Sequence, residues 1–310
     1  MNTEKLVVLD THALIHRAFY AVKDLKTRNG VHTNALMGFF RVLIKILETI
    51  KPDYFISVID MPGKTFRHID FPAYKATRTK APEELYSQIP LIYELLSTVE
   101  IPILGVEGFE ADDLAGSISK NKDLDKDIDV ILITGDFDYL QLIDAKTKVI
   151  HFKKGFSEYL EYNLENTKSI MRITPNQIID YKSLVGDSSD NLPGVKGIGK
   201  VTAIKLINNY DNLDNIYANI DNIEGKVKDY LVIGKDSAYL TKHLSTIKTD
   251  IDINIKQIIK KYNFDEYTDK AVKFCEKYEL YLISDNIQKI GNKNAIKEIR
   301  KDIIQQETLF

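Results

Sequence analysis

Three apolar runs in the first half of the chain each end at or near an aspartate. Runs of this kind, short and rich in Val and Ile, are typical of strands buried in a parallel sheet. In an open α/β sheet, the carboxyl ends of such strands meet at one crevice. The sequence therefore predicts a mostly parallel, doubly wound sheet with acids gathered along one edge. The runs and their acids are Val7–Leu9 with Asp10, Phe55–Ile59 with Asp60, and Val130–Thr134 with Asp136.

Nine carboxylates in total follow apolar runs or lie at expected turns and helix starts. Carboxylates that are brought close together repel one another unless protons or divalent cations neutralise them. Magnesium prefers hard oxygen ligands of this kind. We therefore expect a metal-dependent enzyme. The nine are Asp10, Asp60, Glu110, Asp112, Asp113, Asp136, Asp138, Asp187 and Asp190.

Bulk composition limits the class of protein. A length of 310 residues favours two domains. The apolar stretches are too short to span a bilayer, and the N-terminus lacks the features of a signal peptide. The single cysteine, Cys275, excludes an internal disulfide and suits a reducing compartment. We expect a monomeric cytoplasmic protein, associated with the nucleoid and without a membrane partner.

The net charge of −3 taken alone argues mildly against a nucleic-acid partner. However, basic residues crowd two short segments, and local fields can attract a polyanion despite a near-neutral total. One segment holds Lys64, Arg67, Lys75, Arg78 and Lys80, and the other holds Lys196, Lys200 and Lys205.

Periodicity divides the chain into an α/β part and a helical part. Residues 5–152 alternate strand-like and helix-like segments, including a helix that we expect to begin with Asn34 as its cap and to end near Ile50. From Thr174 onward helical patterns dominate. We predict an α/β core over 1–173, an α-helical domain over 174–283 and a polar tail over 284–310.

The segment from Glu110 to Asp113 carries three acids within four residues, at an expected helix start. Glu110 and Asp113 are three residues apart and can share a helix face, so that both reach one ion. The alternative is simple N-capping on a solvated surface. Gly135–Asp138 and Gly186–Asn191 carry the same ambiguity between a turn and a metal site.

Gly194–Val201 has nearly the spacing of a nucleotide-binding P-loop. The pattern fails because Val201 stands where Ser or Thr should follow Lys200, and no apolar strand precedes it. We expect a helix–hairpin–helix-type turn whose backbone N–H groups approach DNA phosphates, with Lys196 and Lys200 adding charge. A flexible surface loop is the alternative.

Tyr74-Lys75-Ala76-Thr77-Arg78 places an aromatic ring beside two cations. That combination suits stacking on an unpaired base while Lys75 and Arg78 neutralise phosphate. A solvated basic loop is the alternative.

Two further patterns imitate metal sites. The alternating acids from Asp123 to Asp129 lack the Gly and the Glu that a calcium loop requires, so a solvated loop is expected. His12 and His16 are four residues apart, as in zinc helices, but no Glu lies between them. We expect these histidines to be structural.

Taken together, these motifs resemble the 5′-nuclease family: the 5′–3′ exonuclease domain of bacterial DNA polymerase I, phage 5′-nucleases and flap endonucleases. The similarity runs from about Lys5 to Tyr281. It is carried by Leu9-Asp10, Phe66-Arg67-His68, Tyr74-Lys75-x-x-Arg78, Gly108-Phe109-Glu110-Ala111-Asp112-Asp113, Thr134-Gly135-Asp136-x-Asp138 and Gly186–Gly199.

The resemblance implies a PIN-like nuclease core, a helix–three-turn–helix that grips duplex DNA, and a helical gateway over about 64–100 for single strands. It also implies two or more Mg²⁺ ions, replaceable by Mn²⁺. One ion would be held by Asp10, Asp60, Glu110, Asp112 and Asp113 with Asp136, and the other by Asp138, Asp187 and Asp190. The implied catalytic residues are Lys75, Arg78, Asp113 and Asp136. The implied DNA contacts are Arg67, Tyr74, Lys75, Arg78, Gly194, Lys196, Gly197, Gly199 and Lys200.

The implied activity is hydrolysis of DNA at 5′ ends, flaps and RNA primers during replication and repair, by a stand-alone nuclease. Thr11 departs from the family, where a glycine usually follows the first aspartate, and this puts the rate in doubt more than the reaction. Two rivals are a non-catalytic binder of DNA junctions and an RNA-specific PIN-like nuclease. A junction binder would not require nine acids. RNA-specific PIN-like nucleases lack the glycine turn that this chain has at Gly194–Gly199.

The last five residues resemble the pentapeptide by which bacterial replication proteins dock on the sliding clamp. Gln306, Leu309 and Phe310 would be the anchors in a peptide-in-pocket mode. Coincidence in so short a motif is the alternative.

Overall fold

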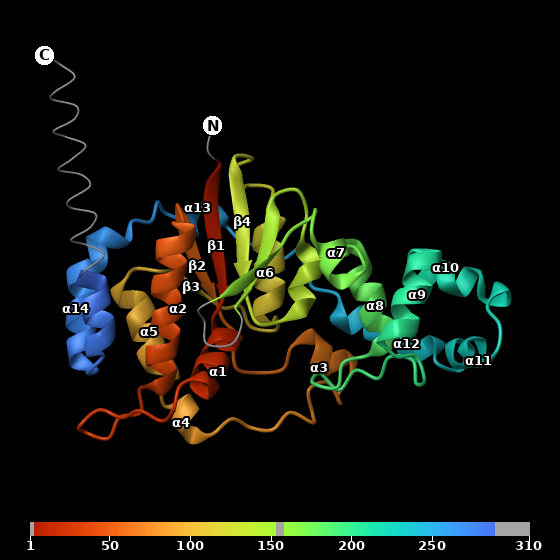
Figure 1. Ribbon diagram of the computed structural model, residues 1–310, viewed down its shortest axis with the longest axis horizontal. Coiled ribbons are helices and arrows are strands. Elements are labelled where there is room, and N and C mark those ends of the chain that lie inside the picture. The colour runs from red at the N-terminus through yellow and green to blue at the C-terminus, as the bar shows by residue number, and fades with distance from the viewer. Residues whose placement is uncertain (1–2, 153–157, 289–310) are drawn as a thin grey trace, which may run out of the picture.

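The computed structural model describes residues 3–152 and 158–288. It contains one six-stranded sheet, parallel except for the last pair of strands, at the centre of Figure 1. The α/β fold predicted from the apolar runs is confirmed. The strands in spatial order are β3 (Ile103–Leu104), β2 (Tyr54–Val58), β1 (Glu4–Asp10), β4 (Ile128–Ile133), β5 (Thr147–Phe152) and β6 (Tyr159–Tyr162).

Strand register aligns the carboxyl ends of the three central strands. Asp10 at the end of β1 lies opposite Val58 of β2, and Leu9 lies opposite Ile133 of β4. The acids that follow these strands therefore leave the sheet at one edge.

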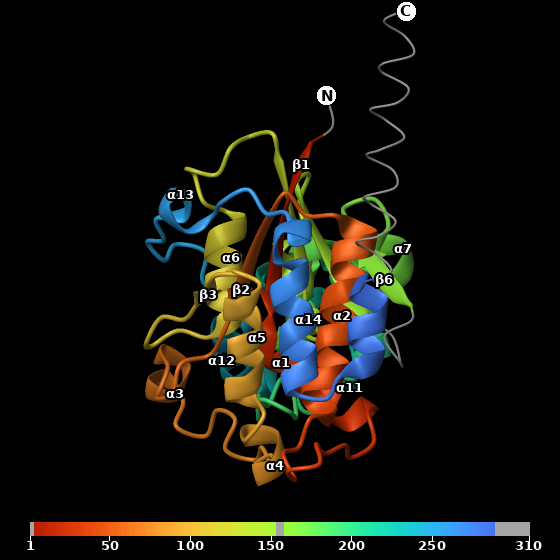
Figure 2. The ribbon, with the colours of Figure 1, turned by 90° about the vertical axis from the view of Figure 1, so that its left-hand side faces the viewer.

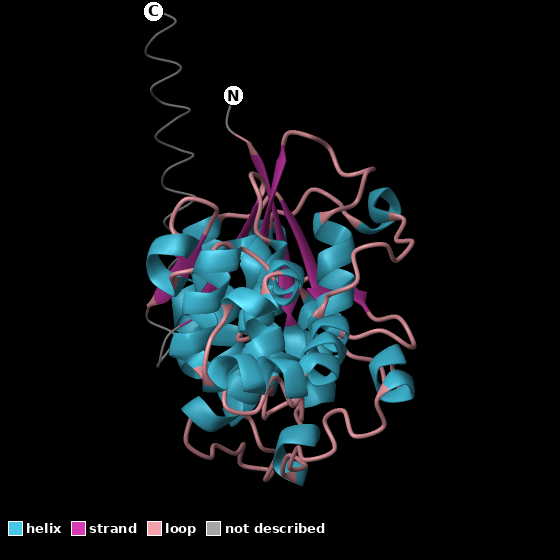
Figure 3. Cartoon of the chain, turned by 90° about the vertical axis from the view of Figure 1, so that its right-hand side faces the viewer, coloured by secondary structure: helices cyan, strands magenta, loops and turns pink. Residues whose placement is uncertain are grey.

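Alternate residues of β1 face two separate cores. Val7 and Leu9 belong to the core beneath one group of helices, whereas Leu6 and Val8 belong to the core beneath another. Figures 2 and 3 show helices on both faces of the twisted sheet. The first group is α1 (Thr11–Ala21), α2 (Asn34–Ile50), α5 (Ile89–Thr98) and α14 (Thr268–Lys277), and the second face is covered by α6 (Ala111–Ser119) and the 3₁₀ helix η1 (Phe137–Leu142).

Helix α2 has the predicted bounds, but Asn34 is not its cap. Thr33 occupies the cap position, and the Asn34 side chain donates a 3.0 Å hydrogen bond to the Phe19 carbonyl and accepts one from Gln88. The buried amide thus ties α2 to the end of α1 and to the start of α5. A side chain that meets two distant segments cannot be distinguished from a cap by local spacing.

The second half of the chain is helical, as predicted, and lies to the right in Figure 1. The chain then returns, and residues of α14 pack into the core beneath α2 and α5. The range 174–283 thus contains parts that pack in different places. The remaining helices are α7 (Thr167–Met171), α8 (Ile178–Val185), α9 (Lys200–Tyr210), α10 (Leu213–Ala218), α11 (Lys226–Ile233), α12 (Lys235–Ser245) and α13 (Ile255–Ile258), with 3₁₀ turns at Pro175–Gln177, Ile220–Asn222 and Phe264–Tyr267.

Within residues 3–152 and 158–288, no helix has both the length and the apolar character needed to cross a bilayer. Cys275 is buried in α14, and burial raises the pKa of its thiol to about 12. A buried thiol with a raised pKa holds little thiolate, so Cys275 is unreactive.

A buried ion pair joins the two halves of the chain. The Arg67 side chain, from the short helix α3 (Phe66–Asp70), is 1% exposed and donates to both carboxylate oxygens of Asp113 at 2.6 and 2.8 Å. Its Nε also donates to the Leu244 carbonyl in α12 at 2.8 Å. Arg67 is therefore enclosed rather than free to contact DNA, which corrects the sequence-based expectation.

Asp113 likewise departs from its expected role as a metal ligand and catalytic residue. It is 0% exposed, and its oxygens also accept hydrogen bonds from the backbone N–H groups of Glu110 and Lys248. Although Glu110 and Asp113 are three residues apart, the Asp113 carboxylate is turned toward the interior. Burial next to an arginine from a distant segment explains the difference.

We predict that Arg67→Met destabilises the protein by about 3–5 kcal/mol, because Asp113 would keep a buried and unpaired charge. The double variant Arg67→Met/Asp113→Leu should recover much of this loss, since neither charge remains. Urea unfolding followed by circular dichroism measures both. A surface DNA contact at Arg67 would instead leave the free energy of unfolding unchanged.

Candidate metal centre

The acids that follow the central strands line one cleft of about 630 Å³ at the carboxyl edge of the sheet. Seven of the nine predicted acids line this cleft, which confirms that distant segments bring them together. Basic residues of α1 and of the loop after α3 face the same space. The acids are Asp10, Asp60, Glu110, Asp112, Asp136, Asp138 and Asp187, and the basic residues are His12, His16, Arg17, Lys75 and Arg78.

Local backbone geometry fixes the first of these acids. Asp10 ends β1 and caps α1, where its carboxylate accepts hydrogen bonds from the Ala13 N–H at 3.2 Å and the Thr134 hydroxyl at 2.8 Å. Burial, together with the charges of Asp60 and Asp136, raises the pKa of Asp10 to about 6. A cation bound beside Asp10 would favour its charged form and so oppose both causes of the raised pKa.

The Glu110–Asp113 segment caps a helix and also borders the cleft. Glu110 is the N-cap of α6 and forms a capping box with Asp113, as simple capping predicts. Glu110 and Asp112 also line the cleft. Capping therefore does not remove these two acids from the cleft.

A second carboxylate group lies where η1 meets the loop after α8. One oxygen from each of Asp138, Asp187 and Asp190 falls within 4.8 Å of the others, and in the described part of the chain this is the only such trio. The Asp187 Oδ1 atom is held by the Ser189 backbone N–H at 2.7 Å and by the Ser189 hydroxyl at 2.6 Å. This spacing and donor chemistry fit a divalent cation.

His12 and His16 line the cleft, although the sequence suggested purely structural roles. The His12 Nδ1 atom accepts from the Asp60 N–H at 3.3 Å, and its Nε2 atom lies 2.8 Å from the Tyr93 hydroxyl. Burial alone would raise the pKa of Asp60, but hydrogen bonds with His12 and the Ala111 N–H outweigh it and lower the pKa to about 2. The i,i+4 spacing gave no indication of this contact with an acid from another strand.

Three cations are paired with acids among the nine predicted ones. Lys75 contacts Glu110 at 2.7 Å, and Arg78 contacts Asp190 at 2.6 Å. Lys182 of α8 contacts Asp138 and Asp187, and sequence reasoning missed it. The available signal was a lysine among largely apolar residues of a helix that leads directly into Asp187.

Tyr74 does not present its ring for base stacking. It is 3% exposed, and its hydroxyl donates to Glu110 at 3.0 Å and lies 3.4 Å from Asp190. The expectation that Tyr74 contacts DNA is therefore corrected. The ring supports two acids from inside the protein, whereas its neighbours Lys75 and Arg78 reach the cleft.

The predicted DNA-binding turn at Gly194–Val201 has a buried part and an exposed part. Gly194 has a φ of +58° and is buried, and a Cβ there would lie 2.3 Å from the Gly186 nitrogen. This close backbone approach explains the glycine and removes Gly194 from the predicted DNA contacts. Lys196, Gly197, Gly199 and Lys200 are exposed around the start of α9.

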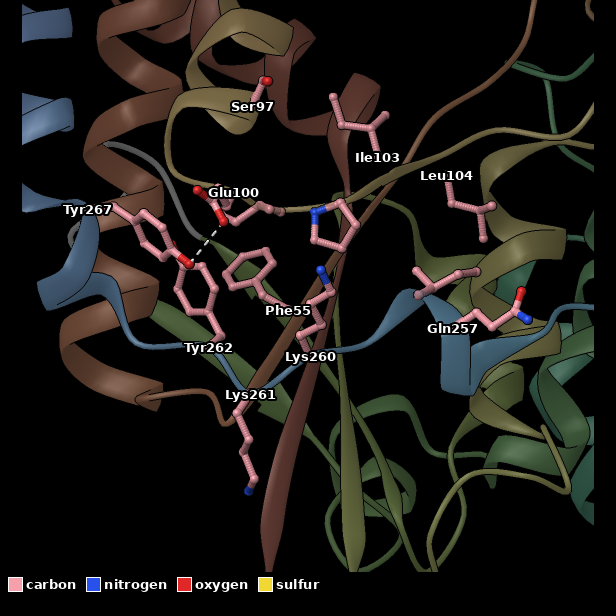
Figure 4. A pocket seen from close by; sticks show the side chains of 13 residues that line it. Phe55, Ser97, Glu100, Ile103, Leu104, Gln257, Lys260, Lys261, Tyr262 and Tyr267 are labelled. Carbon is pink, nitrogen blue, oxygen red and sulfur yellow. Dashed lines mark hydrogen bonds between the residues drawn. The ribbon is translucent and has the colours of Figure 1, made fainter.

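Another hollow of about 650 Å³ lies beside the edge strand β3 (Figure 4). Its walls include Phe55, Tyr262 and Tyr267, and Glu100 is the only carboxylate among its lining residues in the described part of the chain. The Tyr267 hydroxyl donates to Glu100 at 3.3 Å. This hollow lacks the clustered oxygen ligands that distinguish the cleft.

Comparisons with known proteins agree with the geometry. Residues 5–178 match the family described as the N-terminal resolvase-like domain of 5′-3′ exonuclease, and residues 173–269 match its C-terminal SAM fold. DNA polymerase I of Caldicellulosiruptor bescii is 43% identical over 254 residues, which is 81% of this chain and 30% of that protein. The Lactococcus lactis subsp. cremoris enzyme is 32% identical over 99% of this chain and 36% of its own length. The chain thus spans about a third of these relatives.

Solved structures share the fold. The phage T5 5′-exonuclease with bound zinc has a TM-score of 0.63 at 21% identity, covering 93% of this chain and 100% of that one. A T5 flap endonuclease in a pseudo-enzyme-product complex with DNA and metal ions gives a TM-score of 0.64 at 21% identity, with the same coverage. With the two family matches covering most of its length, the chain belongs to the 5′–3′ exonuclease family of metal-dependent nucleases, as the motifs predicted.

Proposed function

We propose that this protein hydrolyses DNA phosphodiesters at 5′ ends and 5′ flaps, including strands that begin with an RNA primer, in replication and repair. The observation that supports this most strongly is the convergence of acids from separate segments on one cleft that also holds Lys75 and Arg78. We further propose that the protein acts in the cytoplasm, on the chromosome and as a monomer.

The proposed cofactor is Mg²⁺, with Mn²⁺ as a substitute. One ion would be held by Asp10, Asp60, Glu110, Asp112 and Asp136, and a second by Asp138, Asp187 and Asp190. Ions bound at such carboxylates activate water and stabilise the charge that develops on phosphate. Asp113 is left out because Arg67 and two backbone N–H groups use its oxygens.

Lys75 and Arg78 would bind the scissile phosphate. Both line the cleft, and each is paired with an acid, Lys75 with Glu110 and Arg78 with Asp190, so their positive charges are in place before substrate arrives. They lie in the segment between α3 and α4 (Glu83–Tyr86), which passes below α1 in Figure 1. We propose that this segment and α5, within residues 64–100, form the gateway for the single strand.

The exposed start of α9 would bind the duplex. At Gly199 a Cβ would meet no atom within 4 Å, which leaves room for a phosphate to approach backbone N–H groups, whereas the space beside Gly197 is filled by the Tyr230 ring. Lys196 and Lys200 add charge. The cleft and this turn would then contact the same substrate on either side of the junction.

Asp136→Asn should lower cleavage of a 5′-flap duplex by at least about 100-fold while junction binding in Ca²⁺ remains measurable. The fold should survive, because an amide oxygen can still accept from the Asp138 N–H as Asp136 does at 2.9 Å. Gel-resolved cleavage and fluorescence anisotropy provide the two measurements.

The control for Asp136→Asn is Asp221→Asn, whose side chain is 94% exposed and pairs with Lys228. It should leave both quantities unchanged. Full residual cleavage by Asp136→Asn would contradict the assignment. Binding by the wild-type protein without turnover in Mg²⁺ or Mn²⁺ would favour the rival junction binder.

The double variant Lys196→Ala/Lys200→Ala should weaken duplex binding and reduce the slope of log affinity against log salt by about one for each lysine. Lys228→Ala is the matched control. Lys228 lies in α11 and pairs with Asp221. Anisotropy titrations at several salt concentrations test this. An unchanged slope would exclude these lysines from the phosphate contacts.

We also propose that the C-terminal residues dock on the sliding clamp. Gln306, Leu309 and Phe310 lie outside the described residues, so this rests on the sequence motif alone. Deleting residues 306–310 should abolish clamp-stimulated cleavage and leave basal cleavage intact. If a pull-down retains the same amount of clamp after the deletion, the proposal is wrong.

A further inference from the structure

Lys182 lies inside the carboxylate trio that we assign to the second ion. Its Nζ atom contacts the Oδ2 atoms of Asp138 and Asp187, the latter at 2.9 Å. The lysine is 8% exposed, so this ammonium group is enclosed within the site rather than free in solvent. It forms ion pairs with two of the three carboxylates that would bind a cation.

Two carboxylates of the trio are held by groups other than Lys182. The Asp187 Oδ1 atom is fixed by Ser189, and Asp190 is held by Arg78 at 2.6 Å. The backbone of Asp138 is placed by η1, where its N–H donates to Asp136 at 2.9 Å, whereas its carboxylate contacts Lys182. Without the lysine, Asp187 and Asp190 would keep these contacts, and the negative charge of the trio would be less compensated.

We propose that Lys182 is a built-in competitor for the second divalent ion. Its ammonium group neutralises Asp138 and Asp187 when the ion is absent, and it must give up these oxygens for the ion to bind there. This inference rests on the proposed function, because it assumes the second ion position. It makes the affinity for that ion lower than the three carboxylates alone would give.

Substrate would change this balance. A DNA phosphate in the cleft offers the displaced ammonium group a new anionic partner, so the ion and the substrate should favour one another. Lys182 would then limit loading of the second ion before DNA is present. A lysine that only orients the carboxylates would instead increase affinity for the ion.

The test is Lys182→Met, which keeps the length of the side chain and removes its charge. Calorimetric titration with Ca²⁺ in the absence of DNA should show the weaker of the bound ions binding about tenfold more tightly, or better, than in the wild-type protein. Lys182→Gln should show the same change, which guards against a folding defect of one variant.

The matched control is Lys242→Met. Lys242 also lies between two aspartates, Asp180 at 2.9 Å and Asp214 at 3.2 Å, but neither belongs to the carboxylate trio. Its removal should leave Ca²⁺ binding unchanged. If Lys242→Met binds Ca²⁺ more tightly by the same factor as Lys182→Met, the change is a general effect of net charge and the proposal is overturned.

Thermal unfolding gives a second measurement that does not depend on activity. In chelator, Lys182→Met should unfold at a lower temperature than the wild-type protein, because Asp138 and Asp187 lose their counter-charge. Saturating Ca²⁺ should raise its Tm by more than it raises that of the wild-type protein.

Two outcomes separate this inference from the proposed function. If Asp187→Asn leaves wild-type Ca²⁺ binding unaltered, the second ion position itself is wrong. If Asp187→Asn weakens binding but both Lys182 variants bind Ca²⁺ no more tightly than wild type, the position is right and competition by Lys182 is overturned.

Discussion

Mutual repulsion among carboxylates at one edge of the sheet is the constraint on which the rest of this structure depends. Parallel strands deliver several acids to the same place, and partial burial strengthens their repulsion. Burial and, after it, the charge of Asp60 raise the pKa of Asp10. Arg67, Lys75, Arg78 and Lys182 offset the charge of other acids, namely Asp113, Glu110, Asp190 and Asp138.

These cations also organise the chain. Arg67 lies in α3 and reaches both α6 and the end of α12, and Arg78 joins its loop to the loop after α8 through Asp190. Lys182 ties α8 to η1. The contacts that compensate the acidic edge therefore hold the loop after α3 and the helical part against the sheet. The contacts that neutralise the acids are thus the same contacts that hold these elements of the fold together.

The same arrangement separates a fully paired acid from acids that line the cleft. Asp113 is fully used by Arg67 and backbone donors, whereas Asp60, Asp112 and Asp136 keep oxygens directed at the cleft. A similar division separates Gly194, which permits a close backbone approach, from the exposed Gly197 and Gly199. Neighbouring residues of one motif thus have different structural environments: some are buried and paired, and others are exposed.

The sequence by itself determined the parallel strands, the main helices and the gathering of acids at one edge, because apolar periodicity and strand direction are local properties. It did not determine which acids stay available, since that depends on partners far away in the chain. Arg67 and Tyr74 look like surface binding residues in sequence and are buried in the fold, while His12 and Lys182 look unremarkable and lie at the site. Only tertiary packing decided these roles, because burial and charge pairing are set by segments that meet after the chain has folded.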